Sequence, residues 1–393
     1  MNKDQIASRM QHISPFYVMD LLAQAKQLEA QGHEVIHLEV GEPDFPTPYS
    51  IKAAAIQAIE QGKTKYTGAT GLPELKEKIV EYYRQRLNTC VNSKNIIITP
   101  GASGALQLAL SVLINSNQSV LMADPGYPCN RHFVRLLDAC AHPIPVEANT
   151  RYQLTHQLIE QHWQENTAAV LIASPSNPTG TLIDRDEMKR IIAVVKKKKG
   201  ILLVDEIYQG LVYDQQEFSA AALSNEAFVI NSFSKFFSMT GWRLGWLIVP
   251  DAFIDTVDRL AQNLFLAPPT ISQYAALSAF EESTLKVLDA QRDELNKRRK
   301  FLLNGLTKLG FDISVEPGGA FYIYADVSKF TDNSFKFCND LLHQSHVAIT
   351  PGIDFGDYQV NRYVRFAYTQ NLEKLQLALD RISDFLTLYN YQP

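Results

Sequence analysis

The sequence has few cysteines, and none of them are arranged as a motif. Among the 393 residues there are four, Cys90, Cys129, Cys140 and Cys338, far apart and without a CxxC pair. This usage excludes a disulfide scaffold and a thiolate zinc site, and it indicates reduced thiols. Metal-binding patterns are missing as well. The closest histidine pairs lack a matching third and fourth ligand, so no metal site is expected; they are His343 with His346 and His156 with His162.

Long apolar runs and an excess of one charge are also absent. No stretch of about 18 apolar residues occurs, so no membrane span is expected. Residues 1–16 lack the apolar run of a secretory signal, and we expect a cytoplasmic protein. Lys plus Arg is 37 and Asp plus Glu is 42, a net charge of −5. A nucleic-acid-binding protein would show a basic excess, so that class is disfavoured.

What remains is the composition of an ordinary globular protein, with 46% hydrophobic and 20% charged residues. Short apolar runs without polar alternation predict strands that are covered on both faces. These runs span residues 95–99, 119–123, 168–173, 201–204, 228–231 and 244–249. Helical patterns lie between them, for example at 104–113 and 184–199, where the basic run 196–199 before Gly200 indicates a helix end. Strand–helix alternation predicts a mainly parallel α/β sheet.

A change in amino-acid composition after Pro269 indicates a second structural unit. Residues 270–309 contain no proline and a single glycine, and they predict long helix with at most one break. Beyond them, short strands at 320–325 and 363–368 mix with helices at 333–344 and 372–388. We therefore expect a large α/β domain at 46–270, a helical connection at 271–310, and a small α+β domain formed by 1–45 with 311–393.

Polar residues follow five of the predicted strands. Ligands bind outside the carboxyl ends of strands in an open parallel sheet. The strand ends supply an anion-binding loop (Pro100-Gly101-Ala102-Ser103-Gly104), an aromatic ring (Tyr127), an amide (Asn177), a carboxylate with a tyrosine (Asp205, Tyr208) and a lysine flanked by hydroxyls (Ser232, Ser234, Lys235). Each has an ordinary explanation when taken singly, such as a helix cap for Asp205 or a solvated position for Lys235. Their convergence on one sheet edge indicates a site.

This set of groups suits pyridoxal phosphate. A lysine amine forms a Schiff base with an aldehyde, and a loop that opens a helix binds a phosphate. A carboxylate that keeps the pyridine nitrogen protonated makes the ring an electron sink. Asp205 is the candidate for that carboxylate, and Tyr127 is the candidate for packing on the ring.

The residues also carry a family resemblance. The stretch SFSKFFSMTGWRLGW (residues 232–246) resembles the lysine signature of class I/II aminotransferases, which are fold type I pyridoxal-phosphate enzymes of the aspartate, aromatic and alanine aminotransferase kind. Seven further blocks occur in that family's order: GEPDFPTP, KYTGATGLPELKEKI, PGASGAL, DPGYP, SPSNPTG, VDEIY and VRFAY. The resemblance covers nearly the whole chain. It implies a mainly parallel seven-stranded sheet between helices plus a smaller α+β domain.

The resemblance also implies a role for each site residue. Lys235 would bind the cofactor and shuttle a proton, Asp205 would pair with the ring nitrogen, and Asn177 and Tyr208 would bind the ring's phenolic oxygen. Tyr127 would stack on the ring. The phosphate would be held by the helix start at Ala102, Ser103 and Gly104, by Ser232, Ser234 and Arg243, and by Tyr66 of a neighbouring subunit in a homodimer. Arg365 would bind the substrate carboxylate, and Gly41 would allow a close approach to it.

The reaction that this implies is a ping-pong transfer of an α-amino group between an L-amino acid and a 2-oxo acid, with 2-oxoglutarate or pyruvate as expected acceptors. Enzymes with the same cofactor leave another outcome open, a C–S β-lyase or an aminocyclopropane-carboxylate-synthase-like enzyme. A serine hydrolase using Ser103 is a remote alternative, because glycine is missing where Ala105 stands in the elbow pattern. A third alternative is a non-catalytic module that senses the cofactor. Such a module would usually carry an appended DNA-binding domain, and none is expected in this sequence.

Substrate choice depends on the far end of the pocket. Dicarboxylates would need a second cation there, and Arg9, Arg131 and Arg362 are more simply interpreted as surface arginines. The segment SPFYVM at 14–19 carries Phe16 and Tyr17, and the resemblance places it over the substrate. An apolar cover would suit aromatic or other neutral side chains.

Overall fold

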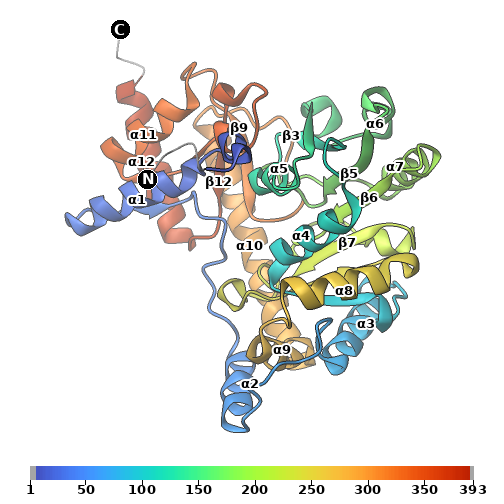
Figure 1. The fold of residues 1–393 in the computed structure, drawn as a ribbon. Helices are drawn as coiled ribbons and strands as arrows, with labels where there is room; N and C mark the ends of the chain where they lie inside the picture. The colour runs from blue at the N-terminus through green and yellow to red at the C-terminus, as the bar shows by residue number, and fades with distance from the viewer. Residues whose placement is uncertain (1–5, 390–393) are drawn as a thin grey trace.

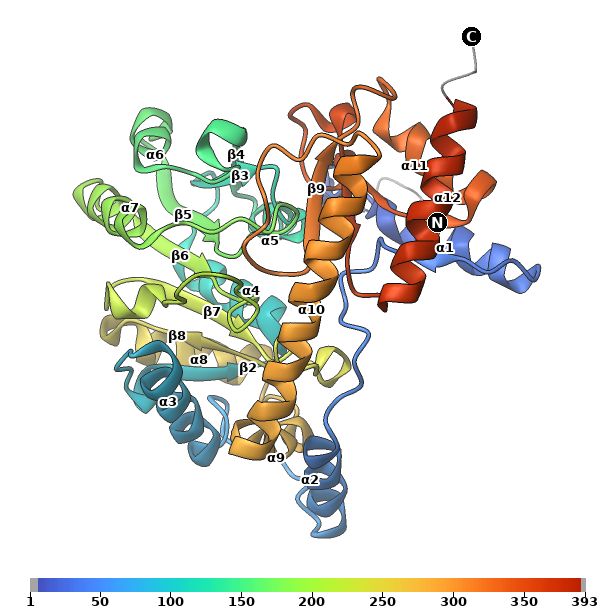
Figure 2. The same ribbon diagram turned by 180° about the vertical axis from the view of Figure 1, so that it is seen from behind.

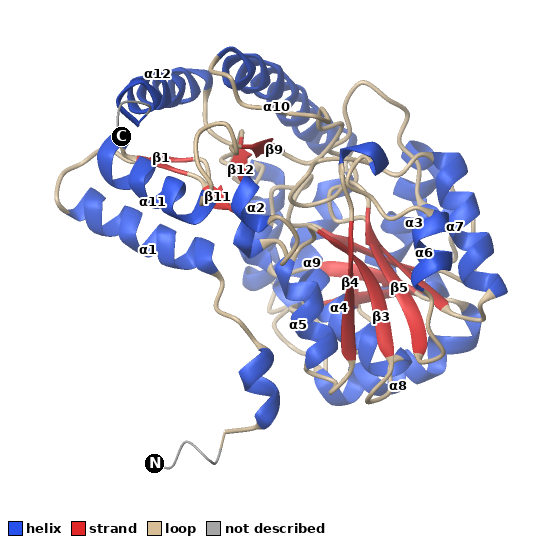
Figure 3. Cartoon of the chain, turned by 90° about the horizontal axis from the view of Figure 1, so that it is seen from above, coloured by secondary structure: helices blue, strands red, loops and turns tan. Residues whose placement is uncertain are grey.

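The computed structural model describes residues 6–389, and its largest element is a seven-stranded sheet with helices on both faces (Figures 1 and 3). The strand order is β2-β8-β7-β6-β5-β3-β4. The strands are β2 (Ile96–Thr99), β3 (Ser119–Asp124), β4 (Cys140–Pro145), β5 (Thr167–Ala173), β6 (Ile201–Asp205), β7 (Phe228–Ser232) and β8 (Gly245–Ile248). Strand β8 runs antiparallel to both of its neighbours, and all other neighbouring pairs are parallel. The expected mainly parallel α/β sheet is confirmed.

Side-chain alternation along the strands divides the core between the two faces of the sheet. Ile97, Leu203 and Leu247 belong to one apolar cluster, whereas Ile98 and Val204 belong to the other. The first cluster includes residues of α4 (Gly101–Leu113), α5 (Pro128–Arg135) and α8 (Ile254–Leu264). The second includes residues of α3 (Pro73–Leu87), α6 (His156–His162) and α7 (Arg185–Lys197). Both faces are covered, which explains why the strand sequences are continuously apolar.

Local signals set the ends of α7 as the sequence indicates. The carboxylate of Asp184 accepts hydrogen bonds from the N–H groups of Asp186 and Glu187, which satisfies two free donors at the helix start. The helix ends inside the lysine run, and the N–H of Gly200 bonds the carbonyl of Val195. The basic run is therefore a helix end, as predicted.

Strand β4 is the one strand of this sheet that the sequence analysis did not predict. Its six residues, CAHPIP, include Pro143 and Pro145, which cannot donate to a ladder. The strand lies at the edge of the sheet, and it pairs with β3 alone. Proline is tolerated at an edge because the missing donors would face outward.

A second group of elements is built around a three-stranded antiparallel sheet, β11 (Thr350–Pro351), β12 (Tyr363–Ala367) and β9 (Tyr322–Asp326). Beside it, β1 (Ile36–His37) pairs in parallel with β10 (Val347–Ala348), which joins this part of the N-terminal segment to the C-terminal part, whereas residues 8–12 contact α5. The helices of this group are α1 (Tyr17–Ala30), α11 (Ser334–Ser345) and α12 (Leu372–Tyr389).

One long helix connects the two groups. Helix α9 (Thr270–Leu277) packs on α2 (Tyr49–Glu60), and after a short interruption α10 (Glu282–Lys308) runs from α9 toward β9 and α12 (Figure 2). The predicted single break in the 270–309 helix is confirmed. None of the helices in residues 6–389 is long and apolar enough to cross a membrane.

Candidate active site

A cavity of about 710 Å³ lies where the carboxyl ends of β6 and β7 meet α1, α4 and the strands β9 and β12. It collects most of the residues that the sequence singled out. These are Gly41, Ala102, Ser103, Tyr127, Asn177, Asp205, Tyr208, Ser232, Ser234, Lys235, Arg243 and Arg365. Because these residues are spread over more than 300 positions of the chain, their convergence is a product of the fold.

Half-buried Lys235 and buried Asp205 face this cavity with perturbed acidity. Burial lowers the pKa of the Lys235 amine to about 8, and burial raises the pKa of the Asp205 carboxyl to about 7. The amine donates to the carbonyl of Gly41 at 2.6 Å, and one oxygen of Asp205 accepts from the N–H of Ile207 at 3.0 Å. An amine with a lowered pKa is a better nucleophile near neutral pH.

An anion-binding corner is formed by the first turn of α4. The N–H groups of Ala102 and Ser103 lie in the first turn, where backbone donors have no partner within the helix. Ser232 and Ser234 hold their hydroxyls 2.9 Å apart beside them. The backbone allows Arg243 to come close, because a Cβ on Gly101 (φ +72°) would stand 2.6 Å from a guanidinium nitrogen.

Arg365 stands on β12 and is 3% exposed. Its guanidinium donates to Asn177 Oδ1 at 2.9 Å, to the carbonyl of Glu39 at 2.5 Å and to Thr350 Oγ1 at 3.2 Å. Its buried Nε has no partner among the described residues. Three of the five N–H donors are thus engaged, and the remaining ones are available to an anion in the cavity.

Tyr322 is a functional candidate that the sequence analysis missed. Its hydroxyl and that of Tyr208 are 2.9 Å apart, and the Arg365 guanidinium lies 4.2 Å from the centre of its ring. A Cβ on Gly41 would stand 2.5 Å from the Tyr322 hydroxyl, so glycine is needed at that position. The available signal was a tyrosine on the strand predicted at 320–325, but only the pairing of β9 with β12 places it beside Arg365.

Two predicted cofactor-binding residues do not line the cavity. Gly104 is buried at the start of α4, where an added Cβ would stand 2.9 Å from Cδ of Pro100, so it serves helix packing. Tyr66 is 80% exposed on the outside of the chain. The remaining lining groups that the sequence analysis missed are Glu39, Val40, Glu42, Leu106, Ile207, Thr240 and Leu22, whereas Val18 and Met19 belong to the predicted cover at 14–19.

The wall of the cavity that α1 supplies is apolar. Phe16, Val18, Met19 and Leu22 line it, whereas Tyr17 packs edge-on against Phe335 instead. Lys235, Arg243 and Arg365 are the cationic side chains among the described residues that line the cavity.

None of the three arginines considered for a second carboxylate faces the cavity. Arg9 pairs with Asp138, and Arg362 pairs with Asp326. Arg131 is half-buried rather than a simple surface residue, and it donates to the carbonyl of Asp354 at 3.0 Å.

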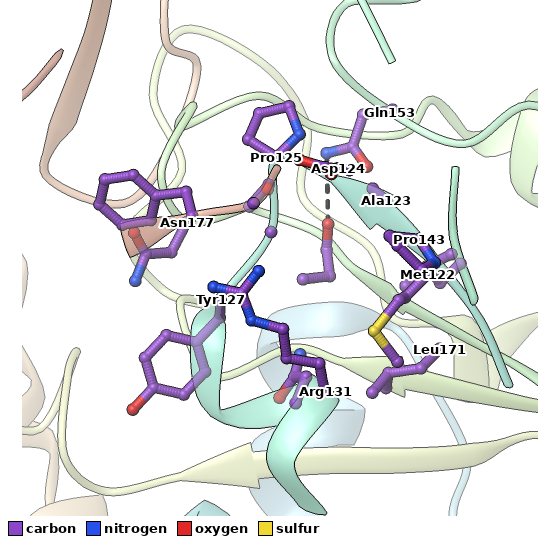
Figure 4. A pocket seen from close by; sticks show the side chains of 17 residues that line it. Met122, Ala123, Asp124, Pro125, Tyr127, Arg131, Pro143, Gln153, Leu171 and Asn177 are labelled. Atoms are coloured by element: carbon purple, nitrogen blue, oxygen red, sulfur yellow. Dashed lines mark hydrogen bonds between the residues drawn. The ribbon is translucent and has the colours of Figure 1, made fainter. Parts of the chain in front are cut away.

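Arg131 lies at a second, smaller cavity of about 40 Å³ (Figure 4). The ring of Tyr127 and the amide of Asn177 lie on the same side of it. Asp124 also lines it and accepts hydrogen bonds from the N–H groups of Asp357 and Tyr358. The small cavity therefore lies behind Tyr127, where β3 meets the segment that follows β11.

The donor set of the large cavity fits pyridoxal phosphate. Lys235 and Asp205 are groups of opposite charge whose charged states are disfavoured by their surroundings. An aldehyde would give the amine a partner, and a protonated ring nitrogen would give the carboxylate one. The corner at α4 supplies free N–H groups and a guanidinium for a phosphate. A hydrolase using Ser103 fits less well, because no histidine is found among the described residues that line the cavity. No group of His, Cys, Asp or Glu within residues 6–389 is arranged to hold a metal ion.

Comparison with known proteins agrees with this geometry. A family model described as "Aminotransferase class I and II" matches residues 33–382. The chain is 39% identical to a (5-formylfuran-3-yl)methyl phosphate transaminase of Methanocaldococcus jannaschii, covering 97% of this chain and 99% of that one. It is 38% identical to a valine–pyruvate aminotransferase of Mycobacterium tuberculosis, covering 98% and 99%.

Solved structures are similar as well. A crystal structure of an aminotransferase from Mycobacterium tuberculosis superimposes with a TM-score of 0.95 at 37% identity, covering 98% of this chain and all of that one. An aspartate aminotransferase from Thermus thermophilus with maleate gives a TM-score of 0.91 at 29% identity, covering 98% and 100%.

Proposed function

Because the chain belongs to the class I and II aminotransferase family, whose members use pyridoxal phosphate, we propose that the large cavity transfers amino groups from amino acids with neutral, apolar side chains. The family makes the protein a transaminase; the residue roles and the substrate class are our proposal. The observation that supports it most strongly is that Lys235, Asp205 and Arg365 face one cavity whose far wall is apolar.

Pyridoxal phosphate supplies an aldehyde for the amine and a ring that accepts the electron pair of the substrate Cα–H bond. Lys235 would be the amine that holds the aldehyde, and as a free amine it would take up the substrate's α-proton. Asp205 would hold a proton at the ring nitrogen, and Tyr127 would pack on the ring. Asn177 and Tyr208 would donate to the phenolic oxygen.

Four groups position the cofactor phosphate in this proposal. They are the N–H groups at the start of α4, the hydroxyls of Ser232 and Ser234, and Arg243. Arg365 orients the substrate by holding its carboxylate, with Gly41 leaving room beside it. Because the phosphate and the substrate carboxylate are each held at a fixed place, the reacting Cα–H bond is held near Lys235.

The substrate class follows from the charges in the cavity. With Lys235 assigned to the aldehyde, Arg243 to the phosphate and Arg365 to the α-carboxylate, no described residue that lines the cavity offers a further cation to a second carboxylate. An apolar side chain would instead gain contacts with Phe16, Val18 and Met19, worth about 25 cal/mol per Å² buried. The relatives named above differ in substrate, so their names do not decide the question.

An absorption spectrum tests the proposed function. The purified protein with bound cofactor is mixed with single amino acids and no 2-oxo acid. We expect the visible band to disappear as one 2-oxo acid forms per site, because the amino group stays on the cofactor. Release of ammonia without that spectral change would instead indicate the β-lyase, and an unchanged spectrum with every amino acid would contradict amino-group transfer.

We also propose a homodimer. Helix α2 and the chain after it expose large apolar side chains, Tyr49, Ile56, Ile59 and Tyr66, on a part that extends from the body (Figure 1). Exposed apolar patches of this kind mark interfaces. Tyr66 would then reach the partner's phosphate. We expect light scattering to give twice the chain mass, and Tyr66→Phe to weaken cofactor binding; a monomer with full activity would contradict the assignment.

Two further features belong to this proposal. We divide the chain into a cofactor domain at 46–270, a helical connection at 271–310 and a small domain of 1–45 with 311–393, since Arg365 and α1 come from the last of these and Lys235 from the first. A cytoplasmic location is supported by the four cysteines, all of which are free.

A further inference from the structure

Helix α1 begins without a cap of its own. Its N-cap residue is Phe16, whose side chain cannot accept a hydrogen bond from the first N–H groups. Those donors are satisfied by Asp354, which lies 337 positions away in sequence. One oxygen of its carboxylate accepts from the N–H of Tyr17 and the other from the N–H of Val18, each at 2.8 Å. Asp354 is 2% exposed, so this is a buried carboxylate at the positive end of a helix.

The segment that carries Asp354 also contacts the active site. Asp354 ends the 3₁₀ helix η9 (Gly352–Asp354), directly after β11, whose Thr350 accepts from Arg365. The ring centre of the next residue, Phe355, lies 4.9 Å from the Arg365 guanidinium. The backbone carbonyl of Phe355 accepts a hydrogen bond from the N–H of Gly126, which precedes Tyr127. One short segment therefore holds the start of α1, the carboxylate-binding arginine and the turn before the aromatic ring.

We propose that Asp354 is a positioning residue that holds the first turn of α1 over the substrate side chain. Its carboxylate fixes the backbone at Tyr17 and Val18, and thereby sets where Phe16, Val18 and Met19 stand in the apolar wall. Arg131 supports the same segment from α5 by donating to the Asp354 carbonyl. Asp354 touches neither cofactor nor substrate, and it acts through the wall.

The inference rests on the proposed function and predicts a selective effect. Asp354→Asn keeps the shape but presents an amide donor to one of the two N–H groups and removes the charge. We expect KM for phenylalanine to rise about tenfold, the usual scale for losing a charged helix cap, with kcat within about threefold. KM for alanine should change less than about twofold, because a methyl side chain does not reach the α1 wall.

Backbone variants at Tyr17 test the same contact from the other side. Tyr17→Pro removes one of the two donors, and proline is well tolerated at the first helical position. Tyr17→Ala keeps the N–H and removes the ring, so it is the matched control. If Tyr17→Pro and Asp354→Asn both act through this contact, the fold-rise in KM for phenylalanine in the double variant will be smaller than the product of the two single fold-rises. Tyr17→Pro also supports the test if Asp354→Asn does not fold.

Hydrogen exchange gives a readout without activity. In cofactor-free protein, amides of residues 17–22 should exchange about tenfold faster in Asp354→Asn than in the wild type, because the helix start loses its cap. Asp357→Asn is the charge-matched control, since that carboxylate is exposed and lies three positions away on the same segment, while its N–H still bonds Asp124. It should leave exchange and KM unchanged.

The outcomes separate the two proposals. If no amino acid converts the cofactor, the proposed function fails, whereas the exchange result still judges the cap. If amino acids react but Asp354→Asn raises KM equally for alanine and phenylalanine, or leaves exchange at residues 17–22 unchanged, the positioning role is wrong.

Discussion

Replacing Arg365 by lysine tests the carboxylate assignment with the charge retained. The guanidinium is engaged by Asn177, by the Glu39 carbonyl and by Thr350, and it retains unpaired donors on a side chain that lines the cavity. Lysine offers three donors from one nitrogen and cannot form the planar fork that matches a carboxylate. It cannot serve the three protein acceptors and the substrate at the same time.

The size of the effect follows from the bonds that are lost. A hydrogen bond to a charged group contributes about 1.5–3 kcal/mol, and an acceptor left unpaired in the interior costs about 1–3 kcal/mol. Lysine retains the charge and one bond, so we expect a net loss of about 2–4 kcal/mol in transition-state binding. That corresponds to a fall of about 30- to 700-fold in kcat/KM for an amino acid.

The assay compares an amino acid with the primary amine that has the same side chain but no carboxylate. Rapid mixing with excess substrate gives the second-order rate constant of the half-reaction for each. The fall caused by Arg365→Lys should appear with phenylalanine and be within about threefold for phenethylamine, because the amine has no group for the fork. The matched control is Arg362→Lys, which replaces an exposed arginine of the same segment that pairs with Asp326 and does not line the cavity.

Two results would refute this reasoning. An equal loss with the amine would mean that the substitution damages the site as a whole. A loss smaller than about threefold with phenylalanine would mean that the carboxylate binds elsewhere.

The remaining predictions concern the cofactor. Because burial lowers the pKa of Lys235 to about 8, the amine of cofactor-free protein is mostly protonated below that pH. The rate at which pyridoxal phosphate binds covalently should therefore rise with pH and level off above about 8. A rate that continued to rise toward pH 10.5 would contradict the burial argument. Lys235→Ala should abolish turnover, measured as 2-oxo acid formation over many cycles. Asp205→Asn should lower kcat by at least about 100-fold with cofactor still bound, because an amide cannot hold the ring nitrogen's proton by charge; near-normal kcat would exclude the role. Gly101→Ala should raise the dissociation constant of the cofactor about tenfold or more by displacing Arg243, with KM for the amino acid little changed, as titration by fluorescence can show.

Much of the large sheet could be predicted because its determinants are local. An apolar run such as 201–204 must be buried on both faces, and the polar residue that follows it must lie at the sheet edge where parallel strands end. Lys235, Asp205 and Asn177 were located in that way before any fold was known. Strand β4 could not be, since its prolines oppose strand formation and only an edge position tolerates them.

Other features depended on contacts between distant parts of the chain. Tyr322 is one tyrosine among 17 until β9 pairs with β12 and places it beside Arg365. Arg131 was interpreted as a surface arginine, and only packing shows that it is half-buried and donates to the carbonyl of Asp354.

The sequence by itself indicated most of the residues that line the cavity and to which we assign the chemistry, because strand ends and helix starts expose particular groups through rules that act over a few positions. The tertiary structure alone decided what the cavity excludes and what holds its wall in place. Asp354 caps a helix 337 positions away, and no local pattern records such a contact, since a buried carboxylate finds its partners only when the chain has folded.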